Sequence, residues 1–193
     1  MSTSGRFDLG IDAYASKISG PEGDEVLDAC GCGVSVSYAH SQGVAVPRPL
    51  RGSAAIDWLA TRNPLTVTTW DDPVVEAAGH HVRSVYVETF WLPTLGPSAT
   101  WVLRRLACWL EAATAPITVD LSDLAVELGL GGGIGRSSPI IRTLARLSQF
   151  QAAGPAGDAY AVRRFLAPLP QRLASQLPGR LAAALQHADR RVG

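Results

Sequence analysis

A helical repeat of apolar positions marks the start of the best-defined part of the chain. Val102, Leu106 and Trp109 recur at i, i+4 and i+7, which places them on one stripe of a helix. We expect this helix to begin with Ser98 as its N-cap and to end before Pro116, because proline cannot continue a helix. Charged residues lie off the stripe, so its apolar side is predicted to face a core.

Two further helices are predicted beyond a short β-branched segment at residues 117–119. Asp120 is expected to cap the first of them, and Gly129 is a natural left-handed stop at its end. A glycine-rich turn follows, and Ser138 with Pro139 predicts the start of the next helix. Its expected inward positions are Ile140, Ile141, Leu144 and Leu147, and its expected outward positions are Arg142, Thr143, Arg146 and Gln149.

The apolar period then changes from helical to extended. Residues 150–153 and 159–165 predict two strands, and residues 154–158 between them predict a tight turn. Two helices, at 170–176 and 178–190, are expected to complete the chain.

The first half of the chain gives weaker signals. Residues 1–50 are acidic and rich in glycine and serine, which predicts a flexible leader or, at 34–39, one short strand. Residues 51–81 are interpreted as a short helix and strand extension, and residues 82–193 as the main domain. The elements expected in between are a helix at 53–62, a strand at 65–70, a turn at 71–73, a helical turn at 74–79, a strand or helix at 85–91 and a loop at 92–97.

The order helix, short strand, helix, turn, helix, hairpin resembles the winged helix-turn-helix of transcriptional regulators. The residues that carry the resemblance are 119–130, with Leu-Ala-x-x-Leu-Gly at 124–129, and 138–147. It covers about 98–167, roughly a third of the chain. The implied fold is mainly α with a small β-hairpin wing (α+β), a winged helix-turn-helix with an N-terminal extension. One departure is the turn after Gly129, which is about twice the usual length of ~3–4 residues.

The resemblance implies that the third helix enters the major groove and that the hairpin contacts the DNA backbone or the minor groove. Arg142 and Arg146 lie one turn apart on its outer face and could reach base edges or phosphates. Successive strand residues face opposite ways, so at most one of the two hairpin arginines should face the duplex. The expected DNA-binding residues are Arg136, Ser138, Arg142, Thr143, Arg146, Gln149, Arg163 and Arg164. A solvated arginine-rich face is the alternative interpretation.

Charge supports an anionic partner only in the second half of the chain. Acidic and basic residues balance at 17 each. Residues 1–80, however, carry ten acidic and five basic residues, a net of −5, whereas residues 81–193 carry seven and twelve, a net of +5. Sixteen of the basic residues are arginine, so their number is weak evidence and their placement must decide.

The sequence gives no sign of metal, cofactor or enzyme chemistry. Cys30 and Cys32, with His40, His80 and His81, lack the spacing of a zinc site, and no nucleophile or carboxylate accompanies the histidines in a motif. The glycine-rich turn matches no nucleotide-binding pattern. Three tryptophans are expected to anchor the core: Trp91, Trp101 and Trp109.

The cysteine count and the start of the chain favour the cytoplasm. Three cysteines do not make a disulfide framework, no secretory signal is recognised, and no uncharged run suits a membrane span. We therefore expect a cytoplasmic, sequence-specific DNA-binding protein, a transcriptional regulator, with double-stranded DNA and a second copy of the chain as partners. Two alternatives stay open: a winged-helix protein-interaction adaptor, and a plasmid or phage replication or partition factor.

Overall fold

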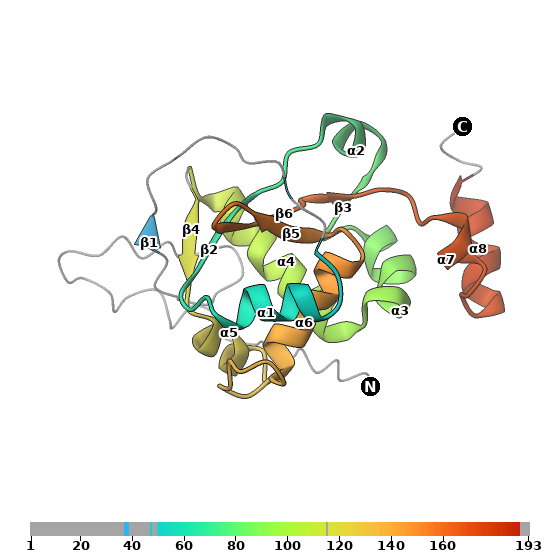
Figure 1. Cartoon of the computed structure of the whole chain (residues 1–193). Coiled ribbons are helices and arrows are strands. Elements are labelled where there is room, and N and C mark those ends of the chain that lie inside the picture. Colours follow the sequence, from blue (N-terminus) through green and yellow to red (C-terminus); the bar gives the residue numbers. More distant parts are fainter. Residues whose placement is uncertain (1–36, 39–46, 48–49, 115, 190–193) are drawn as a thin grey trace, which may run out of the picture.

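The computed structural model describes residues 37–38, 47, 50–114 and 116–189, which form a mixed α/β fold (Figure 1). The predicted leader, apart from Ser37, Tyr38, Pro47 and Leu50, lies outside the described residues. In chain order the elements are β1 (Ser37–Tyr38), α1 (Ser53–Ala60), β2 (Leu65–Thr69), α2 (Pro73–Ala78), β3 (His80–His81), the π-helix η1 (Val87–Trp91), α3 (Leu92–Leu95), α4 (Pro97–Ala112), β4 (Ile117–Val119), α5 (Leu121–Glu127), α6 (Pro139–Gln149), β5 (Ala153–Ala156), β6 (Ala159–Val162), β7 (Phe165–Leu166), α7 (Gln171–Ala174) and α8 (Gly179–Asp189).

The main sheet is larger than the hairpin that the sequence predicts. Its strand order is β1-β4-β2-β6-β5, with β2 antiparallel to β4 and parallel to β6. Leu65 and Val67 of β2 are fully buried, as expected for alternate residues on the core face of a strand. The segment interpreted as an extension therefore supplies a central strand, and a boundary at residue 82 separates β2 from both of its neighbours.

The hairpin turn is tighter than predicted. It consists of Gly157 and Asp158 alone, with Gly157 at a φ of 62°, as two-residue hairpin turns favour at their first position. Residues 154–156, predicted as turn, belong to β5 instead. Pro155 is tolerated there because β5 is the edge strand, where a missing N–H costs no ladder bond.

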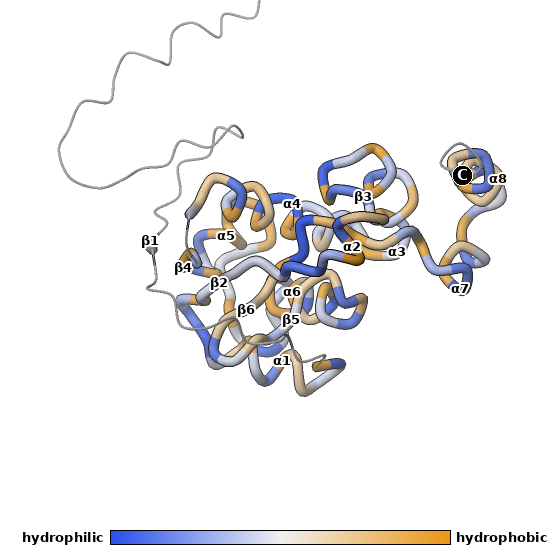
Figure 2. The backbone as a smooth tube through the Cα atoms, turned by 90° about the horizontal axis from the view of Figure 1, so that it is seen from above, coloured by the Kyte–Doolittle hydropathy of each residue, from blue (hydrophilic) through white to orange (hydrophobic). Residues whose placement is uncertain are grey.

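The helical core follows the predicted apolar stripes. Val102, Leu106 and Trp109 of α4 are buried, and so are Ile140 and Leu144 of α6, which packs against α4, α1 and β5. The tube in Figure 2 accordingly changes between hydrophobic and hydrophilic positions along its helices, which is typical of helices with one buried face.

The prediction of a loop at 92–97 is wrong. Helical structure runs from Val87 through α3, and Leu95 is completely buried. Pro97 lies in the first turn of α4, where proline breaks no helical hydrogen bond. Pro93 is the second residue of α3 and follows directly on η1, so its missing N–H falls where the π-helix passes into the α-helix. Gly96, at a φ of 83°, makes the corner between these two helices.

The C-terminal helices lie to one side of the body. Both views show α7 and α8 beyond α3, away from the main sheet (Figures 1 and 2). Leu177 and Leu185 are buried, and α8 contacts η1, so this end of the chain is attached to the core through apolar contacts.

Candidate nucleic-acid interface

The candidate interface is built on α6. Ser138 occupies the N-cap and Pro139 the first helical turn, as the sequence predicts. Three outward side chains at i, i+4 and i+7 form an exposed stripe, namely Arg142, Arg146 and Gln149.

This stripe borders a groove of about 470 Å³. One wall is α6, a second is the beginning of α1 at Gly52 and Ile56, and the third is the α3–α4 corner from Leu95 to Ala99. Among the described residues that line it there is no carboxylate. The groove is therefore a concave surface on which the charged side chains, as far as the described residues go, are arginines.

Arg142 and Arg146 have different surroundings within the groove. Arg146 donates from Nε to the Leu95 carbonyl oxygen and from Nη2 to the Thr94 carbonyl oxygen, both at 2.6 Å. Its guanidinium also lies 5.4 Å from the centre of the Phe150 ring. Arg142 is exposed, and within the described part of the chain it has no ion pair or hydrogen-bonded partner for its side chain. Arg142 is thus the side chain of this stripe that is ready to meet an external anion.

The prediction that Thr143 points outward is wrong. Its exposed fraction is 8%, and α6 packs against α1, α4 and β5. The periodicity of α6 alone could not show this, since one of these elements, α1 at residues 53–60, lies more than eighty positions earlier in the chain. Thr143 nevertheless lines the groove.

The two predicted contacts before α6 have neighbours within the protein. Arg136, in the glycine-rich turn, forms an ion pair with Asp57 of α1. Ser138 is buried, and its hydroxyl oxygen makes no hydrogen bond among the described atoms, although its carbonyl accepts from the Arg142 N–H at 3.1 Å. The turn itself is fixed to α5 by the Ser122 hydroxyl, which donates to the Gly132 carbonyl at 2.8 Å.

The arginine after β6, Arg163, has partners inside the protein. Its Nη1 is 2.9 Å from Oδ2 of Asp72, its Nε donates to the Gln151 carbonyl at 3.0 Å, and its guanidinium lies 3.9 Å from the centre of the Trp70 ring. The hydrogen bond from Arg163 holds the pKa of Asp72 below its ordinary value. The side chain of Arg163 is only 11% exposed.

Arg164 is also paired within the protein. Its Nη2 lies 3.2 Å from a carboxylate oxygen of Asp71 and 3.2 Å from one of Glu76. No local pattern in the sequence links these partners to Arg164, because they precede it by 93 and 88 positions. Both arginines therefore join β6 to the start of α2.

The histidines have structural neighbours. The His81 Nε2 lies 2.6 Å from Oε1 of Glu111, and Arg83 pairs with the other oxygen of that carboxylate at 3.1 Å. The Arg83 N–H donates to His81 Nδ1, so Nε2 is the nitrogen that donates to Glu111. His80 stacks on Tyr86 at 3.5 Å between ring centres.

Metal ligation has no candidate cluster in the part of the chain that the structure describes. No group of three or more histidine, cysteine, aspartate or glutamate side chains there could hold an ion. Cys30, Cys32 and His40, which were considered as ligands, lie outside the described residues.

Trp101 departs from the expected core role. Trp91 and Trp109 are buried, but Trp101 on α4 is 59% exposed. It borders a second cavity of about 430 Å³ between α4 and α5, which Leu128 and Leu130 also line. An exposed tryptophan beside leucines is typical of a protein-contact surface.

Comparisons with protein-family models, curated proteins and solved structures returned no match to this chain. Among the helices of the described residues, none has the length and apolar character needed to cross a bilayer.

Proposed function

We propose that the protein is a sequence-specific DNA-binding protein, a transcriptional regulator of the winged helix-turn-helix type, and that α6 meets the duplex. Support comes from the order α4, β4, α5, α6, β5, β6, which follows the helix, strand, helix, helix, hairpin order of that motif. The observation that carries the proposal is Arg142, an exposed guanidinium without a partner among the described residues, in a groove whose described lining holds no carboxylate.

Gln149 is proposed to read a base edge, and Arg142 to bind either a base edge or the flanking backbone phosphate. They lie seven positions apart on one face of α6, which is about 10 Å along the helix axis and comparable to three base-pair steps. Arginine binds guanine and glutamine binds adenine through paired hydrogen bonds in the major groove. Arg146 adds positive charge, although two of its donors are already engaged with carbonyls at the end of α3.

The proposed contact set is narrower than the sequence suggested. Arg163 and Arg164 are engaged by carboxylates around α2, so the hairpin supplies no unpaired arginine to the duplex. In addition, β2 lies between β4 and β6 in the sheet, although it precedes residues 98–167, which carry the resemblance. The sheet is therefore wider than the hairpin of the motif. The interaction is therefore proposed to centre on α6.

The test is duplex binding by the full chain, measured by fluorescence anisotropy over a range of salt concentrations. We expect measurable binding at low salt that weakens steeply as salt rises, because bound phosphates release counterions. Selection of preferred sites from a random duplex pool then supplies the sequence for the variants. On that duplex, Arg142→Ala should raise Kd roughly tenfold or more.

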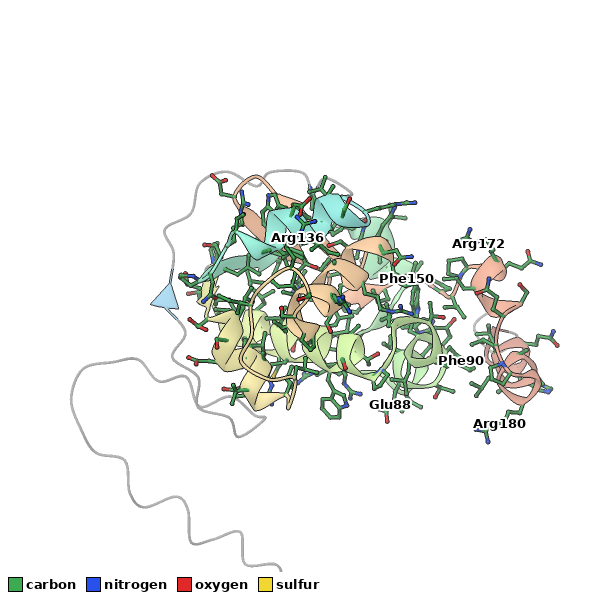
Figure 3. The ribbon with its side chains drawn as sticks, turned by 60° about the horizontal axis from the view of Figure 1, so that its bottom comes forward. Glu88, Phe90, Arg136, Phe150, Arg172 and Arg180 are labelled. Atoms are coloured by element: carbon green, nitrogen blue, oxygen red, sulfur yellow. The ribbon has the colours of Figure 1, made fainter. Side chains whose placement is uncertain are left out.

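A matched control is available on α8. Arg180 is exposed, and in the described part of the chain it has no ion pair. Figure 3 shows Arg172 and Arg180 on the C-terminal helices, away from Arg136 of the turn before α6. Arg180→Ala removes the same charge and should leave Kd nearly unchanged. Absence of duplex binding at low salt, or equal losses in the two variants, would count against the proposal.

A second candidate function is a protein-interaction adaptor, which the exposed Trp101 favours. Val126 on α5 is 62% exposed as well, and the residue that follows it, Glu127, lines the second cavity together with Trp101. If the full chain binds no duplex but captures a protein partner, and Trp101→Ala abolishes the capture, the adaptor function replaces DNA binding. A plasmid or phage replication or partition factor would also bind duplex DNA. It would differ in where the preferred sequence occurs, at a replication origin or partition site instead of a promoter.

A further inference from the structure

The first turn of α4 presents free donors to the groove. Pro97 has no N–H, and the Thr100 N–H donates to the Gly96 carbonyl oxygen at 3.1 Å as the first bond of the helix. The N–H groups of Ser98 and Ala99 precede that bond and have no carbonyl acceptor within the helix. Both residues line the groove, at the positive end of a helix of 16 residues.

The opposite wall adds positive charge. Arg142 of α6 lines the groove with its guanidinium unpaired within the described part of the chain. Arg146 occupies the carbonyl oxygens at the end of α3, which would otherwise present negative partial charge at the same corner. The corner therefore offers amide hydrogens and guanidinium groups but no exposed anionic group among its described lining residues.

The hydroxyl of a largely buried threonine provides an observation independent of the helix end. Thr143 is 8% exposed, and its side chain makes no hydrogen bond in the described structure. The hydroxyl oxygen is not one of the described side-chain atoms that are closed off from solvent without a partner, so this otherwise buried side chain keeps its hydroxyl open to solvent at the groove. Thr143 borders the groove, so a ligand there can accept the missing hydrogen bond.

We propose that this groove is a phosphate-binding site. The Ser98 and Ala99 N–H groups and the Thr143 hydroxyl donate to the phosphate oxygens, and Arg142 supplies the compensating charge. A volume of about 470 Å³ holds a phosphate together with part of the molecule that carries it. Two sources of this group are possible: a phosphate of the DNA backbone, an assignment that rests on the proposed function, or a free phosphorylated small molecule.

The test is titration of the DNA-free full chain with inorganic phosphate, at ionic strength held constant with chloride, followed by amide NMR. We expect saturable shifts at Ser98 and Ala99. Arg142→Ala should weaken phosphate binding about tenfold or more, because it removes a charge-assisted contact, and Thr143→Val about two- to tenfold. Arg180→Ala is the charge-matched control and should bind as the wild type does. Valine keeps the shape of Thr143, and a melting curve for each variant checks the fold.

To learn which of the two sources supplies the phosphate group, the affinity for the selected duplex is measured with and without inorganic phosphate. If phosphate lowers duplex affinity more than chloride does at the same ionic strength, the site holds a backbone phosphate. If duplex and phosphate bind together, it holds a free phosphorylated molecule, and both results support the site.

The proposal is overturned if phosphate causes no saturable shift at Ser98 and Ala99, or if the Arg142 and Thr143 variants bind phosphate as well as the wild type. Duplex binding that persists in that case leaves the proposed function intact. Phosphate binding without any duplex binding removes the proposed function and keeps the site.

Discussion

The arginines of the candidate interface differ in what their guanidinium groups contact. Arg146 is bound to backbone carbonyls, Arg163 and Arg164 to carboxylates, and Arg142 to no side chain of the described structure. The sequence places Arg142, Arg146 and Gln149 correctly on an exposed face, because helical period fixes the direction of a side chain. It cannot assign their partners, since those come from residues far away along the chain.

Arg163→Ala is expected to lower the free energy of unfolding by about 1–3 kcal/mol, since it removes an ion pair, a hydrogen bond to a backbone carbonyl and a stacked guanidinium at once. Thermal or urea unfolding followed by circular dichroism measures the change. The folded variant should keep its duplex affinity, because this guanidinium is already engaged by Asp72, the Gln151 carbonyl and the Trp70 ring. An unchanged unfolding curve together with weaker duplex binding would show that Arg163 contacts DNA after all.

Asp72 gives the protein a defined response to acid. The hydrogen bond from Arg163 is the main cause that lowers the pKa of Asp72 in the folded protein. The ionised carboxylate therefore stabilises the fold at pH values above the pKa of the unfolded state. This contribution is lost as the pH falls through the pKa of the folded state. Asp72→Asn keeps a side chain that can cap α2. Wild type should therefore be more stable than Asp72→Asn at neutral pH, and the difference should close below about pH 4. Urea unfolding of both proteins from pH 3 to 7 measures it, and a gap that does not depend on pH contradicts the assignment.

At the scale of elements, boundaries with a local chemical signal are predicted well. Asp120 caps α5 through its carboxylate, which accepts from the Ser122 N–H at 2.7 Å, and Gly129 has a φ of 67° after that helix. Both features depend on neighbouring residues alone. The position of β2 between two later strands, and the burial of Thr143 on a helix that packs against several elements, depend on contacts between distant segments, which periodicity does not contain.

Tyr160 joins β6 to α6 and is the element-scale contact best suited to a test. It is fully buried, and its hydroxyl donates to the Leu144 carbonyl at 2.7 Å and lies 3.1 Å from the Ser148 hydroxyl. Burial raises its pKa, so the phenol remains protonated. Tyr160→Phe should lower the free energy of unfolding by about 1–2 kcal/mol in urea titrations, because the ring stays and one buried hydrogen bond is lost. Equal stability of the two proteins would mean that the Ser148 hydroxyl replaces the bond without cost.

At the scale of the whole molecule, the structure changes what should fold independently. The sequence suggests a main domain at residues 82–193, but that fragment lacks β2 and leaves open the edges of β4 and β6 that face it. We expect residues 82–193 to be unfolded or aggregated when expressed alone, whereas residues 50–193 retain β2 and should fold. Circular dichroism and amide NMR of both fragments check this. A well-dispersed NMR spectrum from residues 82–193 would restore the original boundary.

The central place of β2 also has a consequence for synthesis on the ribosome. Val67 pairs in register with Tyr160, so the parallel partner of β2 is translated 93 residues later. At about 5–20 residues per second, the nascent β2 waits roughly 5 to 20 seconds for that partner. During this interval its alternating apolar residues have no completed sheet to join, and an unpaired strand of this kind is a template for association between chains. The protein's yield in the cell should therefore depend on translation speed and on chaperones that hold the emerging chain.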